Sequence, residues 1–136
     1  KKKRHTLKTQ VFVEQATGRI ICLAHGKGRR HDFRLFKMSR VRVHPKTEIL
    51  ADSGYLGLQK LHKNTSLPKK RSKKVPLTRD DKRQNREQSK RRVRIENVNA
   101  ALKRFRVLAG KYRNRRKRFG LRFTLIAALY NKDLPK

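Results

Sequence analysis

The feature that most constrains the fold is a helical repeat of apolar residues within the stretch Thr78–Lys111. Five apolar side chains follow one another at steps of three, four, three and four residues: Ile95, Val98, Leu102, Phe105 and Ala109. This spacing predicts one long amphipathic helix that ends near Gly110. The later segment Phe119–Tyr130 is apolar nearly all round, which is typical of a buried helix. The apolar residues are thus concentrated in a few segments, so a hydrophobic core is possible.

The N-terminal part of the chain has the patterns of short strands. Apolar and polar residues alternate from Thr6 to Val13, and Arg19–Ala24 contains a continuous apolar run of strand length. The residues Glu14–Gly18 between them favour a turn, so the two segments predict a β-hairpin.

Short elements are predicted after the hairpin, before a loop. We expect a helix at His31–Met38, a strand at Glu48–Ala51 and a helix at Tyr55–Leu61. Residues 63–77 contain two prolines and many lysines, which favours an exposed loop. The predicted fold is one α/β domain over residues 1–136, with a sheet-rich part (1–62), a basic loop (63–77) and a helical part (78–136).

The charge of the chain points to nucleic acid as its partner. The sequence has 41 lysines and arginines against 9 aspartates and glutamates, a formal net charge of +32. Proteins with this balance neutralise phosphates. We expect phosphate contacts from Lys73, Lys74, Arg113, Arg115, Arg116 and Arg118.

A membrane is not the expected partner. The most basic runs lack a broad apolar face, and no stretch approaches the roughly 18 apolar residues that span a bilayer. A single cysteine, Cys22, excludes an internal disulfide, and no secretory signal is visible. These features predict a cytoplasmic protein.

Asp52 is one of two acidic residues whose position suggests chemistry. It directly follows the predicted buried strand, and ligands of open α/β sheets bind beyond the carboxyl ends of strands. The alternative interpretation is that Asp52 starts a turn or caps the next helix, since Asp-Ser-Gly is typical of turns.

Glu96 is the second such residue. On a helix it shares one polar stripe with Arg92, Asn99 and Lys103, beside the apolar stripe. The alternative is an ordinary solvated face with ion pairs between residues four apart, worth about 0.2–0.5 kcal/mol per pair.

Two segments in this order resemble DDE transposases of bacterial insertion sequences. Leu50–Tyr55 resembles the segment that carries the second aspartate of that family. Arg92, Glu96 and Lys103 fit the spacing of the third segment, a tyrosine followed by arginine, glutamate and lysine, although Ser89 stands in place of the tyrosine. Gly28–Phe33 resembles the stretch between the first and second acids, and the basic run Arg113–Arg118 with the apolar tail resembles the C-terminal helices of the family. The resemblance therefore covers essentially the whole chain.

This resemblance implies an RNase H-like mixed sheet flanked by helices and DNA transposition by metal-dependent cleavage and strand transfer. Asp52 and Glu96 would be catalytic ligands of two Mg²⁺ or Mn²⁺ ions, about 3.5–4 Å apart in such sites. Arg92 and Lys103 would support them, by meeting phosphates or favouring the ionised glutamate. The implied partners are the ends of the element, the target DNA and a second copy in the transposition complex, in the nucleoid of a bacterium.

The chain departs from the family at its beginning. The first aspartate of the family lies on a strand before the hairpin, and no acidic residue of this chain takes that place. We therefore expect the first strand to belong to a missing N-terminal portion and this C-terminal portion to be inactive alone. The alternative function is a basic structural RNA-binding protein of ribosomal type, suggested by the small size and the charge.

Overall fold

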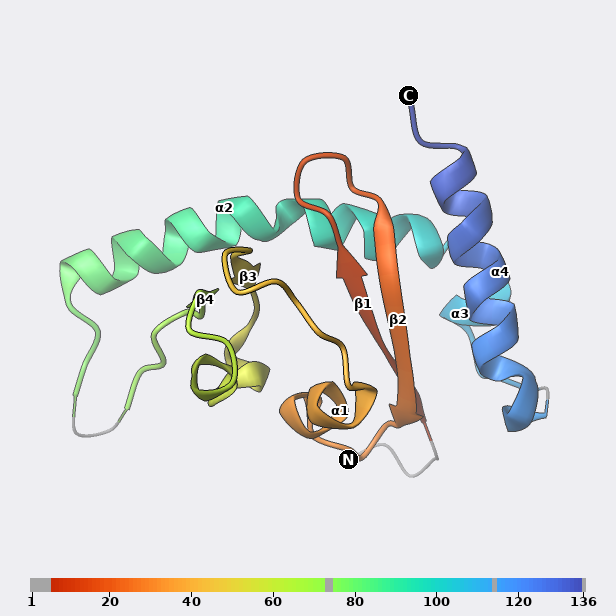
Figure 1. Ribbon diagram of the computed structural model, residues 1–136, viewed down its shortest axis with the longest axis horizontal. Coiled ribbons are helices and arrows are strands. Elements are labelled where there is room, and N and C mark those ends of the chain that lie inside the picture. The colour runs from red at the N-terminus through yellow and green to blue at the C-terminus, as the bar shows by residue number, and fades with distance from the viewer. Residues whose placement is uncertain (1–5, 73–74, 114, 136) are drawn as a thin grey trace. The chain divides into compact units, whose positions relative to one another are not determined.

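The computed structural model describes residues 6–72, 75–113 and 115–135 (Figure 1). Short strands and helices are mixed along the chain, which confirms the predicted α/β class. The chain divides into two compact units. The first contains Lys27–Val93 and Thr6, and the second contains Leu7–Gly26 and Arg94–Lys136. Helix α2 (Arg79–Leu102) contributes residues to both.

The predicted hairpin forms the start of the second unit. β1 (Leu7–Val13) and β2 (Ile20–Lys27) are neighbouring strands and run antiparallel in Figure 1. At their turn, the amide of Glu14 donates to the carbonyl of Arg19 over 2.9 Å. Gly18 has a φ of 78°, a left-handed conformation that glycine adopts without steric cost, so the turn depends on it.

The hydrophobic core of the second unit joins this hairpin to the end of α2 and to α4 (Phe119–Lys132). Its buried members are Ile20, Val98, Leu102, Phe123, Ile126 and Ala127. Val98 and Leu102 are only 1% and 2% exposed, which confirms the predicted apolar face at these positions.

The prediction that the last helix is buried all round is wrong. The leucines at positions 121, 125 and 129 are 63%, 57% and 51% exposed, whereas Phe123, Ile126 and Ala127 are buried. Only one face of α4 therefore packs against the core. A run of apolar residues predicts that a helix has a face to bury, and the neighbouring elements decide how much of it is covered.

The single long helix predicted over Thr78–Lys111 is interrupted. α2 ends at Leu102, and a short helix, α3 (Arg106–Ala109), follows a turn. The amides of Arg104 and Phe105 donate to carbonyls three residues earlier, which tightens the last turn and ends the regular helix. Phe105 consequently lies 39% exposed instead of continuing the buried stripe. Gly110 follows α3 directly, as predicted.

The first unit holds the remaining elements around the buried side chains of Leu35, Phe36 and Leu58. In chain order these elements are α1 (Asp32–Ser39), β3 (Ile49–Leu50), η1 (Ser53–Tyr55), η2 (Leu58–Lys60), β4 (Thr65–Ser66) and the beginning of α2. The predicted helix near Tyr55–Leu61 is thus two short 3₁₀ turns, separated by Gly57 at a φ of 96°.

β4 corrects the prediction that residues 63–77 form a loop throughout. It pairs in parallel with β3, with Ile49 opposite Thr65 and Leu50 opposite Ser66. The amide of Ala51 donates to the carbonyl of Ser66 over 3.1 Å. Backbone groups alone form this ladder, so the composition of the segment carries no signal for it. Within the described residues, no helix has the length and apolar character needed to cross a membrane.

Candidate active site and basic surfaces

Asp52 lies at the carboxyl end of β3, as predicted. Its Oδ1 accepts a hydrogen bond from the amide of Gly54 over 2.8 Å, and its carbonyl accepts one from Tyr55 over 3.1 Å. The alternative interpretation, that Asp52 begins a turn and caps the following helix, is therefore confirmed for η1. The side chain of Asp52 nevertheless remains 47% exposed. The side chain of Asp52 is thus accessible to a ligand from solvent.

A second carboxylate approaches Asp52 at Gly54. A Cβ built on Gly54 would lie 2.8 Å from Oδ2 of Asp32 and 2.9 Å from Oδ1 of Asp52. Any side chain at position 54 would therefore displace one of these carboxylates. Asp32 is the first residue of α1, and sequence reasoning assigned it no role in the site. The first unit thus gathers two of the chain's 9 acidic residues around one glycine.

The predicted supporting residue Arg92 lies beside Asp52. Its guanidinium is 4.0 Å from Oδ2 of Asp52, and its side chain is 26% exposed. The structure thus brings Arg92 near Asp52 in the first unit.

A stronger ion pair, missed by sequence reasoning, lies at the other end of β3. Arg91 donates to both carboxylate oxygens of Glu48, with Nη1 at 3.0 Å from Oε1. Ser66 of β4 donates to the same Oε1 over 2.7 Å. These hydrogen bonds, first that of Arg91 and then that of Ser66, lower the pKa of Glu48, and the carboxylate raises the pKa of Arg91. Consecutive arginines of α2 thus face the carboxylates on either side of β3.

Glu96 belongs to the second unit and Asp52 to the first. Glu96 is exposed on α2, and within the described part of the chain its carboxylate has no hydrogen bond or ion pair. The ion pairing that the alternative interpretation required is therefore not observed. Lys103 is exposed just beyond the end of α2, and its amide donates to the carbonyl of Asn99 over 3.1 Å.

The donor chemistry suits a hard divalent cation, which prefers carboxylate oxygens. Asp52 offers a partly exposed carboxylate in the first unit, and Glu96 offers an exposed one in the second. Among the residues that the structure describes, no three His, Cys, Asp or Glu side chains gather closely enough to hold a metal ion by themselves. Each of the two predicted ligands is thus suitable in kind for such a cation.

The predicted phosphate-binding arginines occupy the connector before α4. Arg113, Arg115, Arg116 and Arg118 are all exposed, and the last two bound the 3₁₀ turn η3 (Arg116–Arg118). The carbonyl of Arg115 accepts hydrogen bonds from the hydroxyl of Tyr112 and from the amide of Arg118. Lys73 and Lys74 lie outside the described residues.

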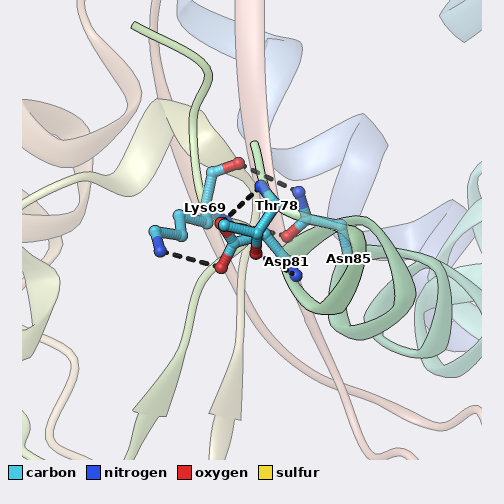
Figure 2. Close-up of polar contacts among 4 residues, drawn as sticks. All are labelled: Lys69, Thr78, Asp81 and Asn85. Carbon is cyan, nitrogen blue, oxygen red and sulfur yellow. Dashed lines mark hydrogen bonds and ion pairs between the residues drawn. The ribbon is translucent and has the colours of Figure 1, made fainter. Parts of the chain in front are cut away.

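Sequence reasoning also missed a polar cluster at the start of α2, which Figure 2 shows. Thr78 and Asp81 exchange hydrogen bonds: the amide of Asp81 donates to Oγ1 of Thr78 over 3.1 Å, and the amide of Thr78 donates to Oδ2 of Asp81 over 3.0 Å. This is a capping box, in which a hydroxyl and an acid three residues apart satisfy the first amides of a helix. The spacing of Thr78 and Asp81 was therefore a usable signal for the helix start.

Comparisons with known proteins agree with these motifs. A family model described as DDE superfamily endonuclease matches residues 1–131. The chain is 50% identical over 130 residues to a protein from Microchaete diplosiphon described as a probable transposase for insertion sequence element IS702. This match covers 96% of the chain and 47% of the relative, so the chain spans about half the length of that relative.

No solved structure matches the chain at a significant level. Neither sequence match supports the RNA-binding alternative. The family match extends over almost the whole length, and the second-aspartate and glutamate segments lie inside it in the expected order. The chain therefore belongs to the DDE superfamily of endonucleases.

Proposed function

We propose that this chain is the C-terminal part of the catalytic region of an insertion-sequence transposase, which cleaves DNA and joins it to a target. The observation that carries this proposal is the 50% identity to the probable IS702 transposase over nearly the whole chain. Family membership supports an endonuclease, and the relative supports transposition as the process that the cleavage serves.

Asp52 and Glu96 are the proposed metal ligands. Endonucleases of this superfamily generally use divalent metal ions. Two Mg²⁺ or Mn²⁺ ions, when bound, supply activation of the attacking oxygen and stabilisation of the leaving oxygen. Asp52 keeps a partly exposed carboxylate at the end of a strand, and Glu96 keeps one on a helix that has no hydrogen bond or ion pair within the described residues; both observations support the assignments. In this proposal Arg92 and Lys103 hold substrate phosphates and balance the charge of the carboxylates.

The proposed architecture of the complete enzyme is RNase H-like. The hairpin β1–β2 and the parallel pair β3–β4 are two separate two-stranded sheets, and the proposed fold would join them in one mixed sheet. We infer that the N-terminal portion of the complete transposase supplies the first strand and the first catalytic aspartate. Two assigned carboxylates do not complete a site of three, so this chain alone is expected to be inactive.

DNA is the proposed partner, bound through phosphate contacts at the element ends and the target. The exposed arginines of the connector, Arg113, Arg115, Arg116 and Arg118, support this, since planar guanidinium groups grip phosphates with two donors. Lys73 and Lys74 are assigned the same role from the sequence. A homodimer in the transposition complex and association with the nucleoid belong to the same proposal.

Glu96→Gln in the full-length transposase tests the proposed role of Glu96. The substitution keeps the size of the side chain but removes the charge that a metal ion requires. We expect metal-dependent nicking of element-end DNA to fall by about 100-fold or more, since even indirect partners of metal ions cost 10–100-fold. Glu87→Gln is the matched control, because Glu87 is an exposed acid of the same helix, paired with Lys90. Equal nicking by both variants would contradict the assignment.

A further inference from the structure

The segment that follows β4 is held against α2 by hydrogen bonds of Lys69. The side chain of Asn85 binds both backbone groups of Lys69: Oδ1 accepts from its amide and Nδ2 donates to its carbonyl, each over 2.9 Å. The ammonium group of Lys69 also donates to Oδ1 of Asp81 over 2.7 Å. Figure 2 shows these contacts converging on the first turns of α2. Three atoms of one residue are therefore held by two side chains of the helix.

Asp81 joins this anchor to the start of the helix. One of its oxygens accepts from Lys69 and the other accepts from the amide of Thr78. The hydrogen bonds from Lys69 and then from Thr78 lower the pKa of Asp81 to about 2, so the carboxylate is ionised throughout the neutral range. Lys69 and Thr78 therefore both donate to the carboxylate of Asp81.

The residues directly after the anchor are basic. Lys70 and Arg71 are exposed, and residues 70–77 contain no acid. The amide of Val75 donates to Oγ of Ser72 over 3.0 Å. Ordering a free residue costs about 1–2 kcal/mol of backbone entropy. A segment that is already held in place loses less conformational entropy when it binds a charged surface.

We propose that Asn85 and Asp81 are positioning residues that hold Lys70 and Arg71 against the phosphate backbone of duplex DNA. The proposal rests on the proposed function, since it assumes that the chain binds DNA. It differs from a general attraction between a +32 chain and DNA because it assigns an effect to Asn85, an uncharged residue. An uncharged side chain changes the electrostatics of binding only if it decides where charges are held.

Binding of the 136-residue chain to a labelled 30-base-pair duplex, followed by fluorescence anisotropy between 50 and 300 mM NaCl, tests this proposal. Asn85→Ala is compared with Gln84→Ala, because Gln84 is an exposed neighbour on the same helix and neither change alters the charge. We expect Asn85→Ala to weaken binding about 5–10-fold and to reduce the slope of log K against log salt by about 1–2, the loss of one or two phosphate contacts. Gln84→Ala should leave both quantities unchanged.

A second comparison keeps the test valid if Asn85→Ala perturbs folding. The double variant Lys70→Gln/Arg71→Gln leaves the anchor intact and should reduce the salt slope by about 2. In an Asn85→Ala background the same two changes should have a clearly smaller effect, because their positioning is already lost.

The outcomes separate this inference from the proposed function. If Asn85→Ala and Gln84→Ala bind DNA with the same affinity and the same dependence on salt, the inference is overturned and DNA binding stays in place. DNA binding that is unaffected by Lys70→Gln/Arg71→Gln would do the same. A parent chain that does not bind DNA at all would overturn both proposals.

Discussion

Asn131→Ala is expected to destabilise the second unit strongly, because one side chain satisfies both backbone groups of a buried residue. Oδ1 of Asn131 accepts from the amide of Ile20 over 2.8 Å, and Nδ2 donates to the carbonyl of Ile20 over 2.8 Å. Ile20 begins β2, belongs to the core and is only 7% exposed. Alanine would leave both groups without these partners.

The expected loss follows from the two orphaned groups. A buried donor or acceptor without a partner costs about 1–3 kcal/mol. Two groups at the lower half of that range give about 2–4 kcal/mol in the free energy of unfolding. With a urea m-value of about 1–3 kcal/mol/M, the unfolding midpoint should fall by about 1 M or more. Circular dichroism of the chain in a urea titration measures both quantities.

Two further variants make this reasoning refutable. Asn131→Asp keeps an acceptor for the amide of Ile20 but has no donor for its carbonyl, so its effect should be intermediate. Asn97→Ala removes an exposed asparagine of α2 and should stay within about 0.5 kcal/mol of the parent. If Asn131→Ala also stays within that margin, the side-chain amide of Asn131 does not stabilise β2.

Two other predictions concern charge. Burial lowers the pKa of His25, so the unfolded chain takes up a proton before the folded chain does as the pH falls below about 6.5. The free energy of unfolding should therefore decrease between pH 7 and 5. Thermal unfolding should lose this pH dependence in His25→Gln but keep it in His44→Gln, since His44 is exposed. Glu48→Gln should lower the free energy of unfolding by about 1 kcal/mol or less, because its ion pair with Arg91 is partly exposed. A loss that is equally large in 1 M NaCl would argue against an electrostatic cause.

The helical and strand-like segments could be predicted because their signals are local. The hairpin and α1 depend on residues close in sequence, and a spacing of three or four residues correctly marked Val98 and Leu102 as buried. The same spacing failed at Phe105, where the last turn of α2 tightens while the apolar period continues in the sequence. It could not show that Leu125 lies on an open face of α4, because the extent of burial depends on the neighbouring elements.

The polar contacts that fix the segments could not be predicted from composition. Asn85 binds the backbone of a residue 16 positions away, and Asn131 binds that of a residue 111 positions away. Nearly all residue types carry the same backbone amide and carbonyl, so the sequence does not show which residue an asparagine side chain will bind. The exchange between Thr78 and Asp81 spans only three positions, and there the capping-box spacing does carry a signal.

The candidate site shows the same difference between a motif and the contacts that support it. The motif names Arg92 and Asp52, which lie 4.0 Å apart and are both partly exposed, so this pair alone constrains the geometry weakly. Glu48, outside the motif, accepts two hydrogen bonds from Arg91 and a third from Ser66. Neighbouring residues of a helix point about 100° apart, so fixing Arg91 at one end of β3 also fixes the direction in which Arg92 leaves the helix. The hydrogen bonds between α2 and the residue before β3 thus come from Arg91, which the motif omits.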